Sequence, residues 1–227
     1  MENDKKQFLI LFDMDGVLLD SAAAIIGSLR FALQKNGQSG FDKADLTQFV
    51  GPPLAVMIAS LLPNSNQELR EQCAIDYRVH NNLNGPDLTS VYRGIQDVLI
   101  DLAEKFELRV ATSKLESAAE LVLKKKNLDQ FFQGIHGSSL DGADSKTDVI
   151  SRALAASKQA NPLIIPLVMI GDRKHDVEGA KNLGIESIGV TWGYAPSGEL
   201  VEAGAHHLVS SPQQLLSVVH QLAAQTR

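Results

Sequence analysis

Two aspartates stand directly after a short apolar run near the N-terminus, and this pattern constrains the fold more than any other feature of the chain. The run is FLIL at residues 8–11, and FDMDGV follows it at residues 12–17. An apolar run of this length is typical of a buried strand. In an open α/β sheet, ligands bind beyond the carboxyl ends of the strands. We therefore expect Asp13 and Asp15 at the ligand-binding edge of such a sheet.

Two carboxylates this close together are costly to bury. An unpaired carboxylate loses its hydration when it is buried, and two neighbouring carboxylates also repel each other. A divalent cation would offset that cost, and Mg²⁺ favours carboxylate oxygens together with water and substrate phosphate. A carboxylate can also act as a nucleophile that forms an acyl-phosphate. Taken alone, however, the pattern is more often a strand that ends in a polar turn.

Three further polar blocks follow along the chain. Two come directly after predicted strands at residues 108–111 and 167–170, and the third lies at the predicted start of a helix. Because parallel strands end at one edge of their sheet, we expect these blocks to lie near the two aspartates. The blocks supply hydroxyl groups, a lysine and two more carboxylates, from Thr112 and Ser113, from Lys146, and from Asp172 and Asp176.

The order of the predicted elements indicates an α/β fold with a helical insertion. From residue 94 onward, strand patterns alternate with helix patterns, which predicts a doubly wound parallel sheet with right-handed crossovers. The segment before it contains only helix and turn patterns and is too long for a simple crossover. We therefore expect an α/β core domain of residues 1–19 and 89–227 and a small all-helical cap domain of residues 20–88.

Local signals predict the course of the insertion. Asp20 and Ser21 precede an apolar periodic segment, so we expect them to cap its helix. A short helix is expected over residues 42–50, which GPP at residues 51–53 would end. Residues 82–86 are rich in asparagine, glycine and proline, and we expect a turn there.

The four polar blocks, in this order and on these elements, resemble the motifs of the haloacid dehalogenase-like (HAD) superfamily. The resemblance extends from Asp13 to Asp176. It implies a Rossmann-like core and Mg²⁺-dependent hydrolysis of small phosphate monoesters through an aspartyl-phosphate. The resemblance thus predicts a phosphoric monoester hydrolase.

Residue type and position within these blocks assign catalytic roles. Asp13 is the expected nucleophile, and Asp15 is the expected general acid and base, which protonates the leaving alkoxide and later deprotonates water. Thr112, with Ser113, is expected to bind phosphoryl oxygens. Lys146 is expected to offset their negative charge and that of Asp13.

The same blocks provide the expected metal ligands. Asp13 and Asp172 would bind Mg²⁺ through their carboxylates, and in similar families the backbone carbonyl of the residue at Asp15 is the usual third protein ligand. Asp176 is expected to hold a metal-bound water or the ammonium group of Lys146.

The lysine block departs from the family pattern. Family members often carry proline after this lysine, whereas Thr147 follows Lys146 here. Lys158 is therefore an alternative for the same role.

Details of the motifs narrow the reaction. Haloacid dehalogenases lack the second aspartate of the first motif, so Asp15 argues against dehalogenation. Residues 49–54 and 189–194 resemble segments of phosphoglycolate phosphatase and of bacterial 5′-nucleotidases. Val17 also fits a phosphosugar mutase of the β-phosphoglucomutase type, which stays an alternative. A catalytically silent HAD-fold binding protein is a further alternative, against which the presence of the acidic and lysine motifs argues.

Composition limits the environment and the partners. The net charge is −6 and there is no strongly basic run, so we expect no nucleic-acid partner. No apolar run is long enough to span a bilayer, so we expect no membrane partner. The single cysteine, Cys73, excludes an internal disulfide and fits a cytoplasmic protein. We expect a monomer or small homo-oligomer that binds a small phosphorylated metabolite. The candidate contacts to its leaving group are Arg30, Tyr77, Arg78 and the loop of residues 51–53.

Overall fold

The structure is a computed structural model that describes residues 6–140 and 144–226. Residues 1–5, 141–143 and 227 belong to the predicted core and lie outside the described residues. Among the helices of the described part, none is both long enough and apolar enough to cross a membrane.

A parallel sheet forms the centre of the fold. Its strands are β1 (Phe8–Phe12), β4 (Glu107–Leu115), β5 (Gly134–Ser138), β6 (Ile165–Gly171), β7 (Glu186–Val190) and β8 (His207–Val209). The six strands lie in the order β5-β4-β1-β6-β7-β8, and all neighbours are parallel. The order reverses at β1, because β4 and β5 extend the sheet on one side and β6 to β8 on the other. Such a switch point is where open α/β sheets bind ligands.

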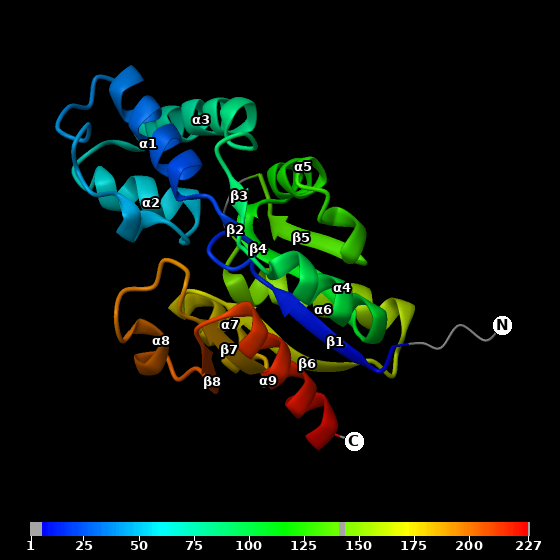
Figure 1. Cartoon of the computed structure of the whole chain (residues 1–227). Coiled ribbons are helices and arrows are strands. Elements are labelled where there is room, and N and C mark those ends of the chain that lie inside the picture. The colour runs from blue at the N-terminus through cyan, green and yellow to red at the C-terminus, as the bar shows by residue number, and fades with distance from the viewer. Residues whose placement is uncertain (1–5, 141–143, 227) are drawn as a thin grey trace.

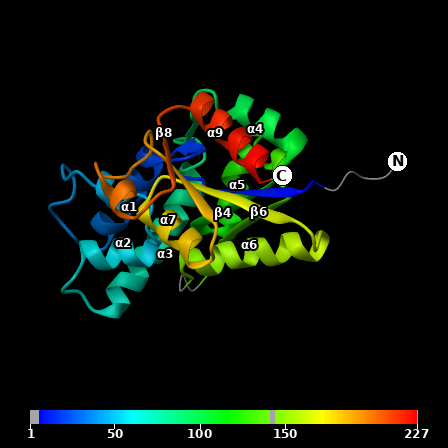
Figure 2. The same cartoon turned by 90° about the horizontal axis from the view of Figure 1, so that it is seen from below.

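Helices cover both faces of the sheet (Figure 2). The strand pleat sends Ile10 and Phe12 of β1 to one face and Leu9 and Leu11 to the other. The first face packs against α4 (Ile95–Lys105), α5 (Glu116–Lys125) and α9 (Pro212–Gln225), and the second against α6 (Lys146–Ala160) and α7 (Lys174–Asn182). This arrangement confirms the predicted doubly wound α/β fold.

Three helices lie apart from the sheet and pack on one another: α1 (Ala22–Lys35), α2 (Leu54–Leu61) and α3 (Gln67–Asn84) (Figure 1). They share a buried apolar cluster of their own, which includes Leu29, Ile58 and Cys73. The chain enters and leaves this helical insertion through β2 (Leu19–Asp20) and β3 (Ser90–Val91), which pair antiparallel. Both connections therefore lie side by side.

Two local expectations for the insertion are wrong. Residues 42–50 form only a 3₁₀ turn at Thr47–Phe49, because the Asp45 side chain accepts a hydrogen bond from the Thr47 amide at 2.9 Å and starts a new turn there. Helix α3 continues to Asn84, into the segment expected to be a turn. The Asn84 side chain donates to the His80 carbonyl at 3.0 Å and so caps the last helical turn from within.

The core also contains short elements that the sequence patterns did not predict. These are the 3₁₀ turn Asp129–Phe131 and the helix α8 (Glu199–Glu202). Helix α8 is a single turn that follows Gly198, whose φ of +89° suits glycine. The carboxylate of its first residue, Glu199, forms an ion pair with Arg173 at 2.8 Å.

Candidate active site

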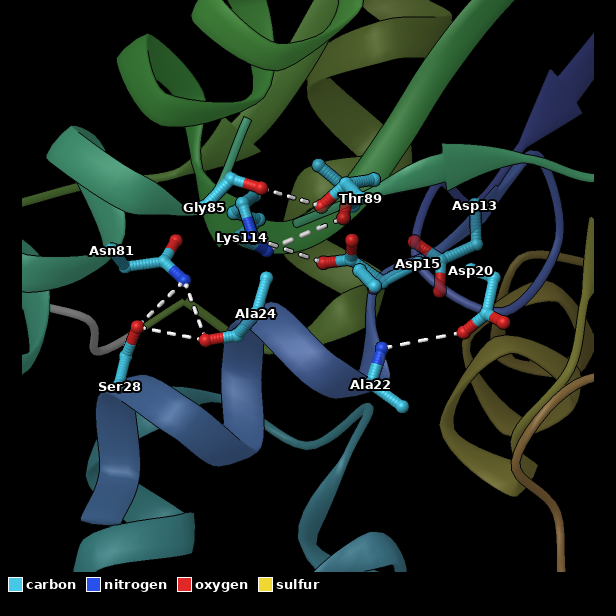
Figure 3. Close-up of polar contacts among 12 residues, drawn as sticks. Asp13, Asp15, Asp20, Ala22, Ala24, Ser28, Asn81, Gly85, Thr89 and Lys114 are labelled. Carbon is cyan, nitrogen blue, oxygen red and sulfur yellow. Dashed lines mark hydrogen bonds and ion pairs between the residues drawn. The ribbon is translucent and has the colours of Figure 1, made fainter. Parts of the chain in front are cut away.

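The first motif leaves β1 at the switch point of the sheet. The Asp13 amide still donates to the Ile170 carbonyl of β6 at 2.8 Å, so the position of Asp13 is fixed by the sheet itself. The chain then turns sharply at Gly16, whose φ is +88°. The side chains of Asp13 and Asp15 are both buried at this edge (Figure 3).

Lys146 reaches the same point from the start of α6. A capping box begins this helix: the Ser145 hydroxyl accepts from the Asp148 amide at 3.2 Å, and the Asp148 carboxylate accepts from the Ser145 amide at 2.9 Å. The Lys146 Nζ atom lies 3.1 Å from Asp13 Oδ1 and 2.7 Å from Asp176 Oδ1. Lys158, the alternative lysine, is exposed on the same helix.

The charges around Lys146 outweigh its burial. Burial disfavours the ammonium form, but the carboxylates of Asp13 and Asp176 raise the pKa of Lys146 above its ordinary value. The ammonium group also donates to the Ala111 carbonyl at 3.1 Å. Lys146 is therefore a fixed, protonated cation beside Asp13.

Three buried carboxylates meet around this lysine. Oxygen atoms of Asp13, Asp172 and Asp176 all lie within 4.8 Å of one another. Burial raises the pKa of Asp13 to about 7 against the opposing effect of Lys146, and burial with the neighbouring carboxylates raises the pKa of Asp172 well above its usual range. If all three carboxylates were ionised, the one ammonium group would leave two negative charges, which a divalent cation would balance.

One carboxylate oxygen of Asp172 has no hydrogen-bond partner among the described residues. Its Oδ2 atom accepts from the Tyr194 amide at 2.7 Å, whereas Oδ1 is buried without a hydrogen-bond partner in the described part of the chain. Gly16 and Gly193 wall the carboxylate, since a Cβ atom on either would lie within 2.5 Å of Asp172 Oδ2. The unpaired buried Oδ1 atom fits a hard cation such as Mg²⁺.

The second motif lies on β4, which extends beyond its expected end and includes Thr112, Ser113 and Lys114. Thr112 is buried, and its hydroxyl accepts from the Lys114 amide at 3.3 Å. Thr112 and Lys114 share one face of the strand because side chains alternate along it. The pairing with β5 breaks between Ala111 and Leu115, where these polar residues stand.

Lys114 contacts Asp15 and was not among the predicted site residues. Its Nζ atom lies 3.2 Å from Asp15 Oδ2, and both side chains are nearly buried (Figure 3). The charge of Asp15 raises the pKa of Lys114 although burial opposes the ammonium form. The signal in the sequence was its spacing of two residues from Thr112, which places both side chains on one strand face.

A cavity opens above these residues, between the sheet edge and the insertion. Its core side includes Asp13, Asp15, Thr112 and Lys114. The side formed by the insertion, called the cap side below, includes the loop of residues 51–53, Tyr77, Arg78, Asn81 and Asn82.

The cap side of the cavity is held by side chains of α1 and α3. The Asn81 amide donates to the Ser28 hydroxyl at 3.2 Å and to the Ala24 carbonyl at 3.4 Å (Figure 3). Of the candidate contacts to a leaving group, Tyr77, Arg78 and the loop of residues 51–53 line the cavity. Arg30 does not, because it donates to carbonyls inside the insertion, among them Ala44 O at 3.0 Å.

Tyr194 joins the site to the entry of the insertion and was not among the predicted site residues. Its hydroxyl accepts from the amides of Ser21 and Ala22 at 2.7 and 3.0 Å, and it donates to Asp20 Oδ1 at 2.9 Å. The expected Ser21 cap of α1 is therefore wrong, since Ser21 makes no side-chain capping bond. Asp20 contributes only a 3.4 Å contact to the Ala22 amide.

Comparison with known proteins places this geometry in a family. A family model described as haloacid dehalogenase-like hydrolase matches residues 10–190. A predicted phosphatase from Clostridium acetobutylicum has a solved structure that is 35% identical, with a TM-score of 0.86 over 95% of this chain and 99% of that one. The 5′-nucleotidase of Pseudomonas aeruginosa is 35% identical over 84% of this chain and 86% of its own length.

The tyrosine-protein kinase PtkA of Mycobacterium tuberculosis is 40% identical over 82% of this chain. The aligned region spans only 62% of the PtkA sequence, so this chain corresponds to part of that relative. The family model covers most of the chain and includes every predicted motif residue from Asp13 to Asp176. This chain belongs to the haloacid dehalogenase-like hydrolase family.

Proposed function

We propose that this protein is a Mg²⁺-dependent phosphatase that hydrolyses small phosphate monoesters through an aspartyl-phosphate on Asp13. The observation that carries the proposal is the position of Asp13. Its carboxylate lies at the switch point of the sheet, 3.1 Å from the Lys146 ammonium and beside Asp172, and it lines an open cavity. A buried carboxylate that is both charge-compensated and accessible to a ligand is suited to nucleophilic attack.

The reaction has two displacement steps. In the first, an Asp13 oxygen attacks phosphorus, the ester P–O bond breaks, and Asp15 donates its proton to the leaving alkoxide. In the second, Asp15 takes a proton from water, the water oxygen attacks phosphorus, and the acyl-phosphate bond breaks to release inorganic phosphate. Lys114 contacts Asp15 at 3.2 Å and would hold that carboxylate toward the cavity.

The remaining core residues would stabilise the phosphoryl group during transfer. The Thr112 hydroxyl, with Ser113, would donate hydrogen bonds to phosphoryl oxygens, and Lys146 would neutralise charge on them. Asp176 accepts from the Arg173 amide at 3.1 Å and pairs with Lys146 at 2.7 Å, so it would keep the lysine in place.

Mg²⁺ fits the carboxylate cluster, and Asp13 and Asp172 would hold it. The unpaired Oδ1 atom of Asp172 and the close approach of the three buried carboxylates support this choice. The family resemblance adds the backbone carbonyl of Asp15. When bound, Mg²⁺ would offset negative charge on the phosphoryl oxygens.

We further propose that residues 20–88 form a cap domain that selects the leaving group, over a core of residues 1–19 and 89–227. The cap side of the cavity supports this, because Tyr77, Arg78, Asn81 and Asn82 line it and could contact the alcohol part of a small metabolite. A nucleoside 5′-monophosphate or phosphoglycolate is the proposed substrate class. The named 5′-nucleotidase relative supports the first of these.

The proposal also includes a cytoplasmic location and a monomer or small homo-oligomer. The only cysteine, Cys73, is buried as a free thiol in the insertion, which is compatible with a reducing compartment. No nucleic-acid or membrane partner is proposed.

A second candidate is transfer of the phosphoryl group from Asp13 to a hydroxyl group instead of water. The name of the PtkA relative, a tyrosine-protein kinase, favours a protein tyrosine as acceptor. A β-phosphoglucomutase-type reaction would use a sugar hydroxyl. Both share the Asp13 step with the phosphatase, so the acceptor distinguishes them. A silent binding protein would perform none of these steps.

One panel of assays separates the candidates. Phosphate release would be measured from para-nitrophenyl phosphate, nucleoside 5′-monophosphates, phosphoglycolate and sugar phosphates, with Mg²⁺ and with EDTA. The proposal predicts release with Mg²⁺ and almost none with EDTA. Isomerised β-glucose 1-phosphate without net release would favour the mutase, and phosphotyrosine formed from ATP would favour the kinase. Absence of every activity would favour the silent binding protein.

A further inference from the structure

We propose that Arg173 is a positioning residue that fixes the loop of residues 48–53, and thereby sets which leaving groups the cavity accepts. The inference rests on the proposed function for its kinetic part only. Arg173 follows Asp172 directly in sequence, yet its side chain extends away from the carboxylate cluster toward the insertion. No motif of the sequence analysis gave this arginine a role.

On the core side, Arg173 is held by a paired carboxylate. Its Nε and Nη2 atoms donate to Glu199 Oε1 and Oε2 at 2.8 and 3.2 Å. The Lys174 amide also donates to Glu199 Oε1 at 3.0 Å. Two parallel bonds of this kind fix both the position and the plane of a guanidinium group. Arg173 is therefore oriented by the core before it contacts the insertion.

On the cap side, the third nitrogen of the same guanidinium binds the loop. Arg173 Nη1 donates to the Val50 carbonyl and lies 3.5 Å from the Gln48 carbonyl. Gly51 packs directly on the arginine, since a Cβ atom there would lie 2.7 Å from Arg173 Cγ. The φ of Gly51 is +112°, which also favours glycine. The backbone at Gly51 therefore packs closely against the side chain of Arg173.

The loop that Arg173 binds forms one wall of the cavity. Gly51, Pro52 and Pro53 line it opposite Asp13 and Asp15, whereas Arg173 itself does not line it. The arginine therefore acts through the loop and not on the substrate. Because Arg173 neighbours Asp172, the same short segment carries a proposed metal ligand and the support of the wall. Arg173 therefore fixes the position of the loop of residues 48–53 relative to the phosphoryl site.

The contact is suited to this task because it is buried and charged. The side chains of Arg173 and Glu199 are 7% and 13% exposed. Lysine at position 173 would keep the charge but could not bind both Glu199 oxygens and the Val50 carbonyl in one plane. Replacing Arg173 by lysine should therefore release the loop without removing the charge from the site.

Amide exchange and kinetics together test the proposal on the full-length protein with Mg²⁺. The variants are Arg173→Lys and Glu199→Gln, and the control is Arg70→Lys. Arg70 also binds a carbonyl, Pro63 O at 2.8 Å, but that contact stays inside the insertion. The direct probes are the amides of Phe49 and Val50, which bond to the Leu46 and Thr47 carbonyls at 3.0 Å.

We expect both test variants to exchange these two amides about tenfold faster than wild type, as loss of a charge-assisted hydrogen bond allows. KM for a bulky ester such as a nucleoside 5′-monophosphate should rise by about the same factor. KM and kcat for para-nitrophenyl phosphate should change by less than about twofold. Arg70→Lys should leave all these quantities unchanged.

Two results would overturn the proposal. One is unchanged exchange at residues 49 and 50 in Glu199→Gln, which retains the arginine and tests the anchor even where Arg173→Lys fails to fold. The other is an equal loss for bulky and small esters, which would show a general structural role. If the wild type hydrolyses no ester, the proposed function fails, and the exchange result still decides whether Arg173 fixes the loop.

Discussion

The two sides of the cavity are built by different means. On the core side, Asp13, Lys146 and Asp176 are buried, ion-paired and positioned by strand ends and a helix start. On the cap side, the lining residues come from a loop and from helix α3, and one of them, Arg78, makes an exposed contact by donating to the Leu140 carbonyl at 3.3 Å. The core side is therefore positioned by the sheet, whereas the cap side belongs to the inserted segment.

This difference suggests a division of labour. Chemistry that is common to all phosphate monoesters would depend on the rigid core side. Recognition of the leaving group would depend on the cap side. Changes to the core side should then reduce activity on every substrate, and changes to the cap side should alter their ranking. The following predictions are ordered from the largest expected effect to the smallest.

Replacing Asp13 by asparagine should have the largest effect. The amide has nearly the same shape but is a poor nucleophile, so we expect kcat on every ester to fall by at least about 10⁴-fold. Steady-state phosphate release measures this loss, and a circular dichroism spectrum checks that the fold is intact. Retention of more than a trace of activity in the folded variant would remove Asp13 from the mechanism.

Lys146→Met should reduce kcat by about 10²–10³-fold, because the phosphoryl group and Asp13 lose their neighbouring cation. Lys158→Met provides a matched control on the same helix, since that lysine is exposed. It should leave kcat within about twofold, as is usual for an exposed surface side chain. An equal fall in kcat in the two variants would show that Lys146 does not neutralise charge at the phosphoryl site.

The core side could be predicted from the sequence because each motif residue follows a recognisable strand or begins a helix. Asp13 and Asp172 directly follow β1 and β6, and Thr112 lies in the last half of β4. A parallel sheet brings the carboxyl ends of its strands together whatever the details of packing. The start of α6 was equally clear, since Ser145 and Asp148 form a local capping box.

Contacts between distant segments could not be predicted in this way. Tyr194 caps α1 from 173 positions away along the chain, and Arg173 binds a loop 123 positions away. Local pattern gave the cap of α1 to Ser21 instead. Such pairs depend on how the insertion docks on the core, which periodicity and turn residues do not encode.

Replacing Tyr194 by phenylalanine tests whether this distant contact, and not Ser21, caps α1. The hydroxyl accepts from two amides at the start of α1, so its loss should lower Tm by about 2–4 °C, as loss of a helix cap does in a protein of this size. Ser21→Ala should have the smaller effect, although the sequence pattern predicts the reverse. Thermal unfolding of both variants is the measurement. A larger fall in Tm for Ser21→Ala than for Tyr194→Phe would show that the Ser21 side chain, and not Tyr194, caps α1.

The smallest effect expected is a pH dependence from the insertion. Lys35 and Asn36 bind the Asp76 carboxylate at 2.7 and 2.9 Å and hold its pKa below the usual range. A lowered pKa in the folded state stabilises the protein above the unfolded pKa, and this stability is lost as pH falls through the folded value. Below about pH 4, Tm should therefore fall more in wild type than in Asp76→Asn, by about 2 °C or less. Parallel curves for the two proteins would contradict this contribution.

The central claim is that the phosphoryl group is transferred to Asp13, and chemical trapping tests it most directly. Protein quenched in acid during turnover of a good ester would be treated with borohydride, which reduces an acyl-phosphate to an alcohol but leaves a free carboxylate unchanged. Peptide mass spectrometry should then find homoserine at position 13, only when both substrate and Mg²⁺ were present. An unmodified position 13 under conditions of rapid turnover, or reduction at another carboxylate, would contradict the account.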